Sequence, residues 1–316
     1  MFDFFLQNQM FLTFVSSLTT LAVCIAIGYT GRKAGVLNDQ LNSGMSTVLV
    51  KIALPCTVFI SMMRPFSRTL LMESLATLLI STLVYLSGYI IGMALARIMG
   101  ASEDEKRVWQ FSLVFANVGY MGFPVIHAVF GYEGMIYTSM ANASFQVLAF
   151  SLGIYLFKKN GDDEVKIDLR SIALNPALLI TFVAFIFFVT GLRLPSVVEN
   201  GIELVSGMTV PLSMLLVGAI LAKSRPLHLV NDPKVLPVIF MRLLGIPLTT
   251  FFILRLLVHN PIMLGVIVIL AAMPAAALTV IFAEQYKGNT AVASKLVALS
   301  SLLCLLTIPL ISLALQ

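Results

Sequence analysis

The chain of 316 residues is 59% hydrophobic and only 11% charged, and its formal net charge is +5. A soluble domain averages about 25% charged residues, so this composition excludes a water-soluble globular protein. The Lys and Arg residues lie mostly in short loops, as they do in membrane proteins, so the positive charge does not indicate a nucleic-acid partner.

Apolar runs of about 20 residues follow one another along the chain, and each has the length of a helix that spans a bilayer. A membrane β-barrel would instead show alternating segments of about ten residues. The sequence therefore predicts an all-α integral membrane protein with ten transmembrane helices. The expected spans cover 9–30, 40–62, 69–97, 106–130, 133–157, 172–191, 198–222, 234–257, 262–284 and 289–313.

Basic residues between the spans predict the orientation. If the N-terminus is outside, the cytoplasmic loops hold thirteen Lys and Arg residues and the outer loops hold four. This bias agrees with the positive-inside rule. We therefore expect a multi-pass protein of the cell membrane with both termini outside, in which 158–171 is a cytoplasmic linker between two five-helix halves, 1–157 and 172–316.

Two pairs of prolines recur at about half the chain length. Pro55 and Pro211 are 156 positions apart, and Pro124 and Pro274 are 150 positions apart. An odd number of spans in each half turns the second half upside down, which predicts a 5+5 inverted repeat of the kind found in many secondary transporters. Because prolines are common in membrane helices, coincidence is the alternative.

The fourth and ninth spans each contain a stretch that disfavours a regular helix. Residues 117–124 include two glycines and a proline, and 272–277 is a run of small residues around Pro274. We expect helices 4 and 9 to be broken and to cross near the membrane midplane. Half-helix N-termini just after Pro124 and Pro274 would then offer free N–H groups to a carboxylate. Two harmless proline kinks are the alternative.

The ionisable residues near the span interiors are Lys51, His127, Arg242 and Lys295, and no Asp or Glu lies near a span centre. Potential cations without a carboxylate partner favour the handling of anions. Lys51 and Lys295 could instead extend to the membrane surface, and His127 could serve only in packing. Arg242 is expected either to attract a substrate or to brace the broken helices.

The fifth span carries three polar residues, Asn142, Ser144 and Gln146. They are expected to line a cavity beside Asn117 or to form ordinary hydrogen bonds between helices. The histidines are isolated and no HExxH motif occurs, so we expect no metal, no cofactor and no enzymatic activity.

Several of these stretches resemble the auxin efflux carrier family, which includes the plant auxin exporters and bacterial permeases for malate and malonate. The resemblance extends over essentially the whole chain. It is carried by residues 28–37, 117–124, 209–221, 273–286 and 300–310.

The resemblance implies a fold similar to that of bile-acid symporters and sodium/proton antiporters. It implies a scaffold lobe of spans 1, 2, 6 and 7, a transport lobe that holds the crossing helices, and a homodimer formed through the scaffold lobe. It also implies that Asn117, Pro124 and Pro274 border the substrate. The chain departs from the family in its short central linker and at 275–278, where some relatives carry a polar residue.

These patterns lead to the hypothesis of a secondary carrier for a small organic anion, such as a mono- or dicarboxylate or an auxin-like acid, that works by alternating access in a lipid bilayer. An ion-coupled cation/proton antiporter on the same fold is the alternative, and it would need a buried carboxylate near the crossing. The residues expected to bind the substrate are Asn117, Gly119, Tyr120, Gly122, Pro124, Asn142, Gln146, Arg242, Met273, Pro274 and Ala275.

Overall fold

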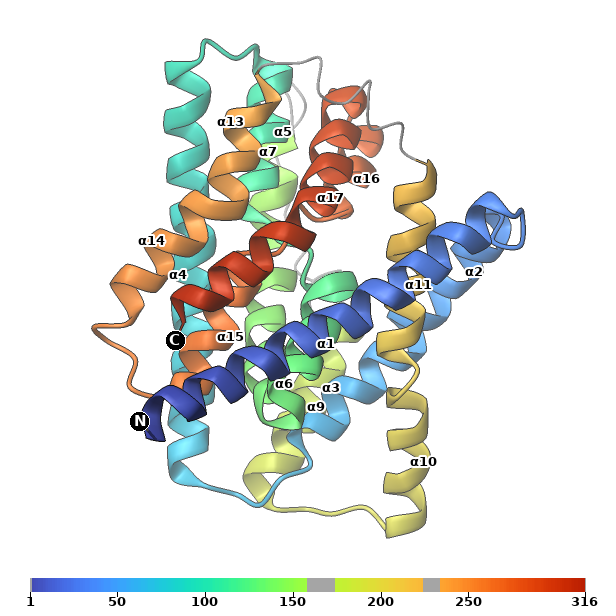
Figure 1. Cartoon of the computed structure of the whole chain (residues 1–316), viewed down its shortest axis with the longest axis vertical. Helices are drawn as coiled ribbons and strands as arrows, with labels where there is room; N and C mark the ends of the chain where they lie inside the picture. The colour runs from blue at the N-terminus through green and yellow to red at the C-terminus, as the bar shows by residue number, and fades with distance from the viewer. Residues whose placement is uncertain (1, 158–173, 224–233, 316) are drawn as a thin grey trace.

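A computed structural model describes residues 2–157, 174–223 and 234–315, and these residues form helices joined by short turns, without a β-strand (Figure 1). The predicted linker at 158–171 lies outside the described residues. The all-helical prediction is therefore confirmed for the described part of the chain.

Six helical segments of the described residues are long and apolar enough to cross a membrane. Two shorter apolar helices accompany them, Pro176–Thr190 and Pro261–Ala271. This pattern is that of an integral membrane protein, because the backbone of a helix satisfies its own hydrogen bonds in lipid. The ten-span count and the inverted repeat stay predictions. The six segments are Asp39–Met62, Arg68–Ile98, Val118–Phe157, Ser196–Lys223, Val235–Leu254 and Thr290–Ser312.

Capping side chains mark the starts of several helices in the first part of the chain, and a glycine interrupts one of them. Asn38 and Ser67 accept hydrogen bonds from the first turns of α2 and α4, and Ser102 forms a capping box with Glu105 at the start of α5. Gly131 adopts a positive φ of 58° and interrupts α6 between the fourth and fifth predicted spans. The helices are α1 (Phe2–Lys33), α2 (Asp39–Val48), η1 (Leu49–Ala53), α3 (Leu54–Met62), α4 (Arg68–Ile98), α5 (Glu103–Val114), η2 (Val118–Gly122), α6 (Phe123–Leu148), η3 (Ala149–Gly153) and α7 (Ile154–Phe157).

Two of the later helices also begin with a capping side chain. Asn175 and Asn260 each cap a helix whose first residue is a proline, which has no N–H group to leave unsatisfied at that position. The helices are α9 (Pro176–Thr190), α10 (Ser196–Ser206), α11 (Thr209–Lys223), α13 (Val235–Phe240), η4 (Met241–Gly245), α14 (Ile246–Leu254), α15 (Pro261–Ala271), α16 (Leu278–Gln285) and α17 (Thr290–Ala314).

Three of the π-helical turns end two residues before a proline. The turn η1 precedes Pro55, η2 precedes Pro124 and η4 precedes Pro247. A proline ring clashes with the carbonyl of the preceding helical turn, and the wider π-turn gives that carbonyl room. The helices therefore continue past these prolines.

Glycines allow the closest helix contact in the described chain. The helix α1 crosses obliquely over the molecule and packs against α11 (Figure 1). At this crossing, an added Cβ on Gly28 would overlap the carbonyl oxygen of Leu215, and one on Gly218 would overlap that of Ile25. Small residues at this crossing let the two backbones approach directly.

Hydroxyl groups join α3 to three neighbouring helices on the side away from α5 and α16. The Thr57 Oγ1 lies 2.7 Å from the Thr209 Oγ1 and accepts a hydrogen bond from the Ser206 Oγ at 3.0 Å. The Ser61 Oγ lies 3.1 Å from the Ser139 Oγ of α6. All five residues are buried, and they form a hydroxyl seam between α3 and its neighbours α6, α10 and α11.

Candidate functional site

The two predicted breaks lie side by side. The chain leaves α5 after Val114 and α15 after Ala271, and the two non-helical stretches form an isolated antiparallel bridge. The Asn117 N–H donates to the Pro274 carbonyl at 2.8 Å, and the Ala276 N–H donates to the Phe115 carbonyl at 3.0 Å. Each break thereby satisfies part of the other's backbone, as a dry membrane interior requires.

The helices restart at places that differ from the prediction. We expected new N-termini just after Pro124 and Pro274, but the first helix resumes at Val118 and the second at Leu278. The first helix resumes before Pro124 because Asn117 caps it: the Asn117 side-chain oxygen accepts the Tyr120 N–H at 3.2 Å. Pro124 then lies inside the continuing helix, where η2 accommodates its ring.

Arg242 binds backbone carbonyls at the C-terminal ends of both α5 and α15. Its Nη1 donates to the Leu113 carbonyl at 2.7 Å, its Nη2 to the Ala271 carbonyl at 2.9 Å, and its Nε to the Met273 carbonyl at 3.0 Å. The side chain is 3% exposed. A guanidinium group near the C-terminal end of a helix binds carbonyls that have no partner in the helix. Of the two roles predicted for Arg242, the geometry favours bracing.

A cavity of about 360 Å³ opens on the other face of the meeting point. Its volume is typical of sites for small organic molecules. The wall consists mostly of apolar side chains from α3, α6, α9 and α16 and from the turns η1 and η3. The large apolar residues are Val50, Leu54, Val58, Val118, Phe123, Phe145, Phe150, Ile180, Leu278 and Ile281.

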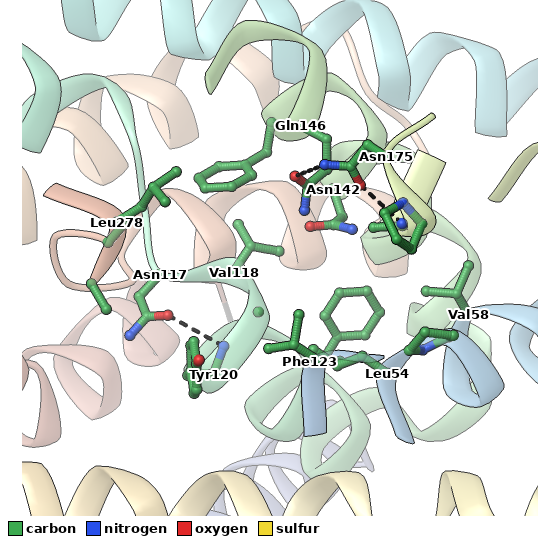
Figure 2. Close-up of a pocket in the computed structure, with 18 of the residues that line it drawn as sticks. Leu54, Val58, Asn117, Val118, Tyr120, Phe123, Asn142, Gln146, Asn175 and Leu278 are labelled. Carbon is green, nitrogen blue, oxygen red and sulfur yellow. Dashed lines mark hydrogen bonds between the residues drawn. The ribbon is translucent and has the colours of Figure 1, made fainter. Parts of the chain in front are cut away.

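The polar lining of the cavity consists of amides, a phenol and an ammonium group. Asn142, Gln146 and Asn175 lie together, apart from Asn117 and Tyr120 (Figure 2). The Asn175 Nδ2 donates to the Gln146 Oε1 at 3.4 Å. Asn142 is 5% exposed, and its amide has no hydrogen bond to any residue that the structure describes. Because Asn142 lines the cavity, its amide is available to a molecule that binds there.

Among the described residues of the lining, Lys51 is the only cation and none is a carboxylate. Lys51 belongs to η1, near the middle of the segment Asp39–Met62, and it is exposed. Among the described residues, its ammonium group has no hydrogen bond or ion pair. The described lining therefore has one cationic side chain and no carboxylate to balance it.

Three helix N-termini contribute to the same wall. Gly119 lies in the first turn of η2, Ala277 and Leu278 lie at the start of α16, and Asn175 caps α9. The N–H groups of Gly119, Ala277 and Leu278 have no acceptor among the described residues. Helix N-termini with free N–H groups are general binding sites for anions.

The cavity brings together five of the predicted site residues, namely Asn117, Gly119, Tyr120, Asn142 and Gln146. The other six predicted residues do not line the cavity. The Pro274 carbonyl accepts the Asn117 N–H, the Ala275 N–H donates to the Ser300 Oγ at 3.1 Å, and Gly122 packs against Leu270. Residues that contact the cavity in their place are Ala116, Ala276 and Ala277. The lining excludes Gly122, Pro124, Arg242, Met273, Pro274 and Ala275.

The sequence interpretation missed two polar residues of the lining. It left Lys51 open as a residue that extends to the membrane surface, and it did not consider Asn175. The Asn175–Pro176 dipeptide was an available signal, because a helix N-cap followed by proline predicts a helix start. Ser144 forms ordinary hydrogen bonds between helices instead, since its Oγ donates to the Leu78 carbonyl at 2.8 Å.

Comparisons with known proteins agree with a transport protein. A model of the family described as membrane transport protein matches residues 13–312. An uncharacterised transporter of Methanothermobacter thermautotrophicus is 27% identical over 97% of this chain and 100% of its own length. An uncharacterised transporter of Methanocaldococcus jannaschii is 23% identical over 91% of this chain and 94% of its own. The chain therefore belongs to the membrane transport protein family, the auxin efflux carrier family that its motifs resemble.

Proposed function

We propose that this transporter is a secondary carrier for a small organic anion and that the anion's carboxylate binds in the cavity beside the two breaks. The observation that carries the proposal is the composition of the described lining, which has one ammonium group, four amides, three helix N-termini and no carboxylate. An anion would balance the ammonium group and could accept a hydrogen bond from Asn142. A cation would be repelled by the ammonium group and by the helix N-termini.

The apolar part of the wall sets the expected size and polarity of the substrate. Phe123, Phe145 and Phe150 offer aromatic surface, and about 360 Å³ accommodates a carboxylate with an apolar body. Mono- and dicarboxylates and auxin-like acids are all in this class. The single ammonium group favours one carboxylate over two.

Alternating access would proceed by movement of the broken helices against α2 and α3. The Tyr120 Oη of η2 lies 2.5 Å from the Ser46 Oγ of α2, so this hydrogen bond joins the two parts at the edge of the cavity. On the far side, the hydroxyl seam keeps the bundle closed. Opening that side would require the Ser61–Ser139 contact to break.

The alternative of a cation/proton antiporter has less support in this geometry. It requires a carboxylate near the crossing, and the described lining has none. Glu73 of α4 lies outside the lining, and its carboxylate accepts the Tyr137 Oη–H at 2.6 Å and the Asn260 Nδ2–H at 2.9 Å. This carboxylate therefore serves the packing of helices and offers no cation site in the cavity.

The first experiment is thermal stabilisation of the purified protein by phenylacetate, hexanoate and malonate, beside phenylacetamide and benzylamine. A ligand that binds only the folded state raises the melting temperature. We expect the carboxylates to stabilise and Asn142→Leu to weaken this effect about tenfold, since the buried amide loses its ligand contact. Exposed Asn200 on α10 provides the control variant Asn200→Leu.

The proposal predicts uptake of the stabilising acid by vesicles that contain the protein. Stabilisation by benzylamine, with none by any carboxylate, would contradict the anion site. Equal stabilisation by phenylacetate and phenylacetamide would also contradict it, because the proposed site recognises charge.

A further inference from the structure

We infer that Arg242 strengthens the positive field of the cavity without touching the substrate, because it neutralises the C-terminal ends of both broken helices. The inference rests on the proposed anion site and adds a second cation, outside the lining, to the charge that Lys51 supplies. Arg242 thus acts on the substrate through its electric field, without direct contact, and is a positioning residue. The cavity lining does not include it.

The contacts of Arg242 are all with the helix ends that face away from the cavity. Leu113 is in the last turn of α5, Ala271 is the last residue of α15, and Met273 lies just beyond it. The residues that resume each helix, Val118 and Leu278, line the cavity on the other face. Each break therefore places a negative helix end beside Arg242 and a positive helix end beside the substrate site.

A charge count shows why the guanidinium matters. A helix carries about −0.5 elementary charge at its C-terminal end and about +0.5 at its N-terminal end. The two breaks thus place about −1 behind about +1. The three residues 115–117 of the first break span at most roughly 10 Å at about 3.3 Å each, and the second break has six residues, 272–277. Without Arg242 the negative ends would offset part of the positive field that the N-terminal ends produce in the cavity. With its single positive charge the negative ends are balanced, and about +1 is left for one carboxylate.

The burial of Arg242 makes this effect strong. The side chain is 3% exposed, and no carboxylate among the described residues forms an ion pair with it. Charges in a dry interior are screened far less than charges at a surface. One unit charge that acts over roughly 10 Å at an effective dielectric constant near 20 changes an anion's affinity about tenfold.

The direct test compares a carboxylate with its neutral amide. Phenylacetate and phenylacetamide have the same shape, so the ratio of their dissociation constants reports the field rather than the fit. We expect Arg242→Gln to reduce the preference for phenylacetate about tenfold, while Arg242→Lys keeps the charge and the preference but lowers thermal stability. A purely structural role would weaken both ligands equally in each variant.

A second route neutralises Arg242 without removing its hydrogen bonds. Ser81 of α4 is 4% exposed, its Oγ has no partner in the described structure, and it shares a void of about 10 Å³ with Arg242. A void of this size holds about one water molecule, and Ser81→Asp would direct a carboxylate into it. We expect Ser81→Asp to reduce the preference for phenylacetate about tenfold, and the control Ser81→Asn, of the same size but neutral, to leave it unchanged.

The outcomes separate this inference from the proposed function. A wild-type protein that binds the two ligands equally would refute the anion site itself. A wild-type preference that persists in both Arg242→Gln and Ser81→Asp would overturn only the role of Arg242. Failure of both variants to fold, while Ser81→Asn folds, would assign Arg242 to structure alone and would also overturn it.

Discussion

Lys51 is the residue whose position most affects the chemistry of the cavity. It comes from η1, in the middle of an otherwise apolar segment, and it is the single cation in the lining. The residue is exposed, and its ammonium group would attract a carboxylate bound in the cavity. It is therefore the first side chain to change when binding is measured.

We predict that Lys51→Met weakens phenylacetate binding about tenfold or more, since a hydrogen bond to a charged group contributes about 1.5–3 kcal/mol. Binding of phenylacetamide should be nearly unaffected. The measurement is the ligand-induced shift in melting temperature, with exposed Lys33→Met as the control. An unchanged phenylacetate shift in Lys51→Met would mean that the ammonium group extends away from the substrate.

At the residue scale, five of the eleven residues expected to bind the substrate line the cavity, and the other six do not. Asn117, Asn142 and Gln146 were identifiable because amides are rare inside membrane helices. Lys51 was left open as a residue that extends to the membrane surface, yet it lines the cavity, whereas Arg242 binds backbone carbonyls outside the lining. Only the tertiary structure shows on which face of the breaks each cation lies.

At the scale of elements, the crossing of α1 and α11 depends on two glycines in direct contact. An added Cβ on Gly218 would overlap the backbone of α1, so the two helices would have to separate. Separation would remove contacts along both helices, and overpacking of this kind costs about 1–3 kcal/mol or more.

We predict that Gly218→Val lowers the free energy of unfolding by about 3 kcal/mol, measured as the shift of the denaturation midpoint in detergent. Gly201 of α10 has no atom within 4 Å of an added Cβ, so Gly201→Ala is the matched control and should not destabilise. If both variants were equally stable, the direct contact of α1 with α11 would be absent in the membrane.

The sequence predicted which stretches of the chain interrupt the helices, but not the residues at which the helices resume. Glycine and proline marked 117–124 and 272–277, because both residues disfavour a continuous helix. The restart at Val118 depends on the Asn117 cap and on the bridge between Ala116 and Ala275. Such pairing between distant segments has no local signal in the sequence.

At the scale of the whole molecule, the hydroxyl seam joins α3 to α6 through Ser61 and Ser139, whose Oγ atoms are 3.1 Å apart. The proposed alternating access would require this contact to open in part of the cycle.

We predict that a disulfide between Ser61→Cys and Ser139→Cys, in a background without Cys24, Cys56 and Cys304, blocks uptake while the cavity still binds phenylacetate. The cross-link would hold the seam closed without altering the lining. Uptake into vesicles is measured before and after reduction, and each single variant is the control. Full uptake in the oxidised double variant would show that transport needs no opening at this seam.

The membrane character and the helical class followed from composition and from the length of the apolar runs, because these exclude a soluble domain and match spanning helices. The family followed from motifs along the whole chain, which the family match over 13–312 confirmed. The inverted repeat and the dimer through the scaffold lobe stay predictions, since they concern symmetry and assembly beyond the contacts described.

Three π-turns hold three of the polar residues discussed above, with Lys51 in η1, Tyr120 in η2 and Arg242 in η4. A π-turn contains one residue more than the regular helix has room for, and each residue of an α-helix accounts for about 100° of rotation. Deleting a single residue from η1 or η4 would turn the π-turn into a regular helix and rotate the residues that follow by about 100°. The number of residues in these turns therefore decides which face of the helix the later side chains occupy.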